Sequence, residues 1–178
     1  MQSFPRHAVL LVAVGSLFAA GYHGQDRSLD EYQKQQDKLS RETSLVGKVK
    51  VLIKISELDL NEASQRVKKG ELLEADRFLK RYAESITQTS KILKDSNRNA
   101  QKNPSGFKDF EMVLRKQLRK LADLKLSYSF DQQETINQAI TTAESAKEQM
   151  FQAIFGPENA SRRKDRNDQT EKGKQEPH

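Results

Sequence analysis

The residues best suited to chemistry in this sequence are cations crowded into one stretch, "VLRKQLRKLADLKL" at 113–126. Arg115 and Arg119 are four residues apart, and so are Lys116 and Lys120, so each pair lies on one side of a helix. Like charges at this spacing destabilise a helix by about 0.2–0.5 kcal/mol a pair. Some negative group should therefore lie close to these cations.

Two kinds of partner could offset the repulsion. Within the chain, Glu111, Asp123 and acids of neighbouring helices would make a solvated face with internal salt bridges. Outside the chain, the partner would be an anionic surface, such as lipid head groups, an acidic protein, a cell-wall polymer or nucleic acid. Aromatic residues do not alternate with the cations, which disfavours nucleic acid. The stretch is thus a candidate anion- or partner-binding surface, with the solvated face as the alternative.

The positions of the histidines and the absence of cysteine disfavour catalysis. The histidines are His7, His23 and His178, all outside the region in which we expect the fold, and there is no cysteine. A Ser-His-Asp or Cys-His nucleophile and a His/Cys zinc site need these residue types. Glu-x-x-His pairs for a di-metal site and a glycine-rich phosphate loop are missing as well. We therefore expect a non-catalytic protein without cofactor or metal.

Carboxylates are the remaining group that could act as acid and base. Two small clusters occur, formed by Glu57, Asp59 and Glu62 and by Asp109 and Glu111. A glycosidase needs two carboxylates across a cleft, one of them with a pKa raised by burial. We interpret these acids instead as solvated helix edges beside Lys54 and Arg66.

The N-terminus is typical of an export signal. The stretch 8–20 is uncharged and 13 residues long, too short for a helix that must cross a hydrocarbon core with about 20 apolar residues. Ala19 and Gly21 suit positions −3 and −1 of a cleavage site. We predict a bacterial-style signal peptide over 1–21 and a periplasmic or secreted protein, with a retained membrane anchor as the alternative. No lipoprotein cysteine is present.

The mature chain would keep 30 basic and 25 acidic residues, a mildly basic balance. Exported domains often use disulfides, yet this chain has no cysteine, so packing alone must hold it. Glycine and proline are scarce between 28 and 155, which disfavours β-structure. The sequence therefore predicts an all-α fold built from long helices, without a transmembrane span in the mature chain.

The apolar spacing divides the fold into helices. A seven-residue series runs through Tyr32, Leu39, Val46, Ile53, Leu60 and Val67 and predicts one long helix over 28–69 that begins at a Ser28 cap. Its second half is apolar on two sides and should be central, whereas 28–44 should project or fray, with a bend near Gly47. Three further helices are expected over 72–96, 107–128 and 131–155, the last one capped by Asp131. We predict an antiparallel bundle of three to four long helices over 28–156, after a short segment 22–27.

The C-terminal stretch 157–178 is different in character. It has almost no apolar residue, and its basic and acidic residues nearly balance. Because it cannot bury enough surface to offset the loss of chain entropy, we predict a disordered charged tail.

The stretch "KKGELLEA" at 68–75 marks a corner. Gly70, Leu72 and Ala75 resemble the turn and second-helix start of a tetratricopeptide repeat, and this resemblance implies a peptide-binding helical hairpin. A step of 34 residues from Gly70 reaches Pro104 in a polar loop, where no second copy begins. We interpret the stretch as a helix-hairpin turn in which Gly70 has a left-handed backbone.

These observations favour binding over catalysis. We expect an exported helical interaction or scaffold protein of the cell envelope, whose partner is another protein or a second copy of itself. The partner would meet the projecting segment 28–44 or the cations of 113–126. One alternative is a binder of an anionic surface through Arg115, Lys116, Arg119 and Lys120; another is a tetratricopeptide-like hairpin module.

Overall fold

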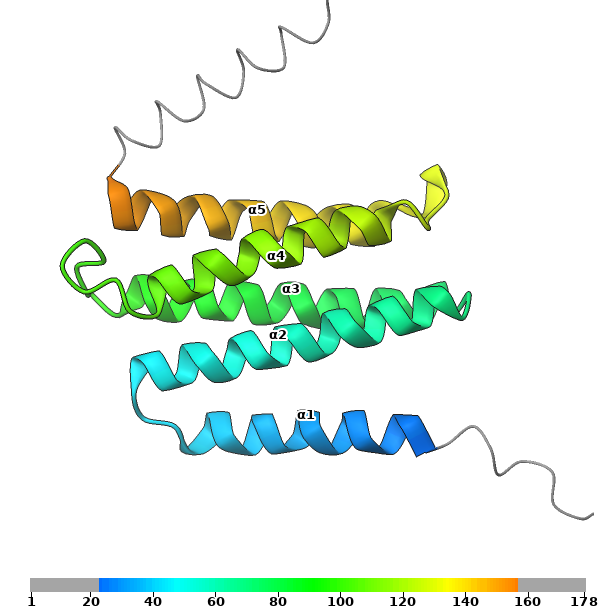
Figure 1. Cartoon of the computed structure of the whole chain (residues 1–178), viewed down its shortest axis with the longest axis horizontal. Helices are drawn as coiled ribbons and strands as arrows, with labels where there is room; N and C mark the ends of the chain where they lie inside the picture. The colour runs from blue at the N-terminus through cyan, green and yellow to red at the C-terminus, as the bar shows by residue number, and fades with distance from the viewer. Residues whose placement is uncertain (1–22, 157–178) are drawn as a thin grey trace, which may run out of the picture.

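The computed structural model describes residues 23–156, and this part of the chain holds helices and no strand (Figure 1). The α-helices are α1 (His23–Arg41), α2 (Leu45–Lys68), α3 (Leu72–Asp95), α4 (Phe107–Lys125) and α5 (Glu134–Phe155), with a short 3-10 helix η1 (Phe130–Gln132) before α5. The predicted all-α class is confirmed. The predicted signal peptide and charged tail lie outside the described residues.

The predicted single helix over 28–69 is wrong, because the chain turns at 42–44 and makes α1 and α2. Ser44 caps α2, since its hydroxyl accepts a hydrogen bond of 3.0 Å from the Gly47 amide. The Glu42 carboxylate accepts bonds of 3.0 Å from both the amide and the hydroxyl of Ser44. These side-chain bonds replace the backbone bonds of a continuous helix. The expectation of three to four long helices is therefore too low for the described residues.

Helix α1 lies antiparallel to α2 along its length, so the predicted projection of 28–44 is also wrong (Figure 1). The reason is the second apolar face of α2. Val51, Leu52 and Ile55 are almost fully buried, and Tyr32 and Leu39 of α1 pack against them. Helix α1 begins at His23, so the expected start at Ser28 lies inside it.

The main core lies between α2, α3, α4 and α5, and consecutive helices run in opposite directions (Figure 1). Helices α2 and α5 each pack against both α3 and α4. Helix α5 faces the core with Ala139, Ala143 and Ala146, whose small side chains allow close approach of its neighbours. Helix α2 contributes to this core with Val49, Ile53, Leu60 and Ala63, and it holds α1 on its other side. The predicted central position of its sequence is confirmed.

Helix α2 ends just before Gly70, the glycine that the sequence analysis placed at a helix end. Gly70 has φ of 76°, and its amide donates to the carbonyl of Val67 while the next amide, of Glu71, donates to the carbonyl of Arg66. This pair of bonds is a Schellman motif, which needs a left-handed residue. The predicted Asp131 cap is wrong, because residues 130–132 form η1 and α5 begins at Glu134.

Candidate functional site

The four candidate cations lie on α4, and three of them, Arg115, Lys116 and Arg119, are on the side away from the core. Phe107, Phe110, Leu114, Leu121 and Leu124 face inward, so the helical period turns the cations outward. Arg115, Lys116 and Arg119 are exposed, and Lys120 is half-buried. We refer to Arg115, Lys116 and Arg119 as the basic face of α4.

One of the expected internal partners is in place. Glu111 is buried, and its Oε1 lies 2.6 Å from Nε of Arg115, one helical turn away. The burial of Glu111 corrects the prediction that it lies on a solvated helix edge. A buried carboxylate needs such a cation, because an unpaired charge away from water is costly. Arg115 is thus committed to stabilising the fold.

Lys120 also has a partner inside the chain. Its Nζ donates a hydrogen bond of 2.5 Å to Oδ1 of Asn61 on α2. Burial lowers the pKa of Lys120, and the nearby Lys68 lowers it further, while Glu57 acts in the opposite direction. Lys120 therefore belongs to the contact between α2 and α4 rather than to the basic face.

Lys116 and Arg119 are different, because they make no hydrogen bond or ion pair with the rest of residues 23–156. Met112 on α4 and Leu126, the residue that follows this helix, are each seven residues from Arg119, and their side chains are 45% and 85% exposed. This side of the helix therefore combines free cations with exposed apolar side chains.

Two more large apolar side chains are exposed near the turns that follow α2 and α4. Leu73 is 81% exposed and Phe130 94% exposed. Both turns lie at the same end of the molecule (Figure 1). The hydroxyl of Tyr128 donates a 3.3 Å hydrogen bond to Asp76, which holds the segment after α4 against α3. This end of the molecule thus has exposed apolar side chains.

The turn residues singled out in the sequence lie together at the α2–α3 corner. Gly70 stands between the two helices, Leu72 is the first residue of α3, and Ala75 is fully buried. Arg66 and Glu71 form an ion pair of 2.7 Å across the corner. The two helices span residues 45–95, so this hairpin is much longer than a 34-residue tetratricopeptide unit.

A polar network crosses the main core, and sequence analysis did not predict it. Tyr82 of α3 donates to Oε1 of Gln117 on α4 at 3.3 Å, and Nε2 of Gln117 donates to the Ser56 hydroxyl on α2 at 2.9 Å. The Ser56 hydroxyl in turn donates to the carbonyl of Ile53. The three side chains are buried, so breaking one of these hydrogen bonds would leave a polar group unsatisfied inside the core. It links three helices at one level.

A second cluster joins three helices near α1. Asp59 of α2 is predicted to lie on a solvated edge, but its side chain is only 2% exposed and pairs with Arg81 of α3 at 3.1 Å. The Arg81 guanidinium carbon stands 3.8 Å from the centre of the Tyr32 ring on α1. We call Asp59, Arg81 and Tyr32 the clasp. A possible signal in the sequence was the position of Asp59, four residues after Ile55 on the second apolar face of α2.

The electrostatics of the clasp are unusual. Burial raises the pKa of Asp59 to about 7; Arg81 opposes the rise, and Glu84 and Glu62 add to it. Its Oδ2 atom is buried without a hydrogen bond from the described residues. Asp59 is therefore near its midpoint of ionisation at neutral pH in the folded state.

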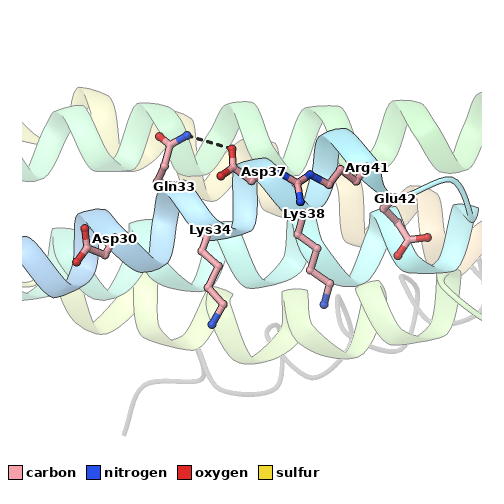
Figure 2. Close-up of a pocket in the computed structure, with 7 residues that line it drawn as sticks. All are labelled: Asp30, Gln33, Lys34, Asp37, Lys38, Arg41 and Glu42. Carbon is pink, nitrogen blue, oxygen red and sulfur yellow. Dashed lines mark hydrogen bonds between the residues drawn. The ribbon is translucent and has the colours of Figure 1, made fainter.

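The described residues hold few other candidates for chemistry. No group of three or more His, Cys, Asp or Glu side chains in residues 23–156 could hold a metal ion. His23, which we expected to precede the fold, is the first residue of α1. Figure 2 shows a hollow on the outer face of α1, lined only by that helix and the turn after it, with Asp30, Asp37 and Glu42 among lysine and arginine. This face is a solvated surface of mixed charge.

Comparison with known proteins adds no functional information: no family model, curated protein or solved structure matches this chain. Among the described residues, none of the helices has both the length and the apolar character needed to span a membrane.

Proposed function

We propose that this chain is an exported, non-catalytic helical bundle of the cell envelope that acts by binding another protein. The observation that supports this proposal is the basic face of α4, where Lys116 and Arg119 lack partners among the described residues and Met112 and Leu126 are exposed beside them. Arginine and methionine are both enriched in protein interfaces.

The test is capture of the partner in the native envelope. The chain is cross-linked in its host, and the bound proteins are identified by mass spectrometry. A Lys116→Glu/Arg119→Glu variant should lose the partner. Lys80→Glu/Lys94→Glu is the matched control, because these two lysines are exposed on α3. A partner retained equally by both variants would contradict the use of this face.

Export is part of the proposal and has its own test. Residues 1–21 have the features of a signal peptide, so the mature chain should begin at Tyr22. N-terminal sequencing of the protein from its host reads this directly. A chain that keeps residues 1–21 in the membrane fraction would support the retained anchor instead.

The second candidate is an anionic surface such as lipid head groups, and the same free cations favour it. Binding to vesicles with anionic lipid should weaken steeply as salt is raised, because screening acts on exposed charges. Lys116→Ala/Arg119→Ala is the variant to use, since removal of Arg115 would leave the buried Glu111 unpaired. Salt-independent binding, or equal binding to neutral vesicles, would argue against this candidate. The tetratricopeptide-like alternative has less support, because each helix of the hairpin is 24 residues long.

A further inference from the structure

The turn between α1 and α2 contains no residue that would break a helix. Residues 42–44 are Glu, Thr and Ser, without glycine or proline. The seven-residue apolar series passes from Leu39 to Val46 across the turn with its step unchanged. The local sequence therefore allows a second conformation, in which α1, the turn and α2 form one continuous helix.

Within the turn itself, three side-chain hydrogen bonds hold the observed form. The Ser44 hydroxyl caps the Gly47 amide, and the Glu42 carboxylate accepts the two bonds from Ser44. All three bonds are exposed to water. Backbone hydrogen bonds would replace them in a straight helix, so the two forms of the turn should differ little in free energy.

Helix α1 packs on an apolar surface that is separate from the main core, and we call this surface the seat of α1. Val51, Leu52 and Ile55 form their own buried cluster, covered by Tyr32 and Leu39 of α1 and by Ile92 of α3. Departure of α1 would leave the main core between α2 and α5 unchanged. It would expose the cluster and Arg81, however, so the seat must be covered again.

We propose that two copies of this chain form a dimer by exchanging α1, with 42–44 straightened into a continuous helix. The α1 of the second copy fits the seat because every contact is the one already made within the monomer, including Tyr32 over Arg81. Only the turn changes its conformation. Exchange of an identical element across a short hinge is a low-cost route to a dimer.

Two variants shift the proposed equilibrium in opposite directions. Glu42→Ala/Ser44→Ala removes the bonds that hold the turn, so the dimer dissociation constant should fall about tenfold or more. Leu45→Pro should block the dimer. Leu45 is the first residue of α2 and follows an extended residue, Ser44 with φ −78° and ψ 140°, where proline fits. In a continuous helix the same proline would break the backbone.

The experiment measures the mass of the full chain by sedimentation over a wide concentration range, before and after refolding from urea. Leu45→Ala is the control for the lost side chain and should still dimerise. Amide hydrogen exchange at residues 43 and 44 should be fast in the monomer and slow in the dimer, which distinguishes exchange of α1 from simple association.

Two results would overturn the proposal. One is a monomer at every concentration for both the native chain and Glu42→Ala/Ser44→Ala. The other is a dimer formed equally by Leu45→Pro and Leu45→Ala, or one whose amides at 43 and 44 stay fast. The dimer does not use the basic face of α4, so Lys116→Glu/Arg119→Glu should dimerise normally, and the outcome is independent of the proposed function.

Discussion

The buried Asp59 makes a sharp prediction for the pH dependence of stability. Burial raises its pKa in the folded state to about 7, against 3.8 for an ordinary aspartate. The folded state therefore binds this proton more tightly than the unfolded chain does. Proton binding by Asp59 therefore adds to the unfolding free energy. This contribution is fully present below about pH 4 and is lost as pH rises towards and through 7.

The magnitude follows from the difference between the pKa of Asp59 in the folded state and in the unfolded chain, because each tenfold change in proton affinity is worth about 1.4 kcal/mol. Part of the loss occurs below pH 5, where the unfolded chain already ionises. Between about pH 5 and about pH 8, the loss of unfolding free energy due to Asp59 should be about 2–3 kcal/mol. The pairing with Arg81 is included in this figure, because it already lowers the folded pKa.

The assay is urea unfolding followed by circular dichroism at several pH values. In Asp59→Asn, residue 59 carries no charge at any pH. The unfolding free energy of the variant minus that of the native chain should therefore rise by about 2–3 kcal/mol between about pH 5 and about pH 8. The exposed Asp123→Asn is the control for the loss of one acid. If the difference between Asp59→Asn and the native chain is constant over this range, the burial argument is refuted.

Three further predictions concern the packing of the fold, each measured as unfolding free energy in urea. Gly70→Val should cost about 1–2 kcal/mol through its left-handed backbone alone, because a Cβ at this site meets no atom within 4 Å; Gly70→Asn should cost less. Tyr82→Phe should cost about 1 kcal/mol, since Oε1 of the buried Gln117 loses its hydrogen bond, and a neutral effect would mean the bond contributes little. Ala143→Leu should cost about 1–3 kcal/mol by overpacking, whereas Leu at the exposed Ala122 should be tolerated.

Much of the fold could be predicted because the helices are long and their apolar spacing is regular. Phe107, Leu114 and Leu121 recur every seven residues in the helix predicted over 107–128, and all three are buried. Gly70 was recognisable because its left-handed backbone is a local requirement. Such features depend on neighbours in sequence, and the sequence displays them directly.

The features that could not be predicted depend on residues far apart in the chain. The break at 42–44 arises because the second face of α2 needs a cover, which a helical pattern alone does not reveal. Asp59 is buried and forms an ion pair with Arg81, which comes from another helix. Of the candidate cations, Lys120 was grouped with the basic face, but its partner Asn61 lies 59 residues away. Local spacing places residues on a helix face, and tertiary contacts then decide which faces remain free.

The network of Tyr82, Gln117 and Ser56 has a mechanical consequence. A slide of α4 by one helical turn would move Gln117 about 5.4 Å and break its bonds to α3 and α2 together. Shear along the helix axes should therefore meet a stepwise resistance at this level of the core. A pull across the axis of α1 acts on the small cluster of Val51, Leu52 and Ile55 and on the clasp, which can separate one contact at a time. Under load the molecule should thus be stiff along its length and should yield first at α1.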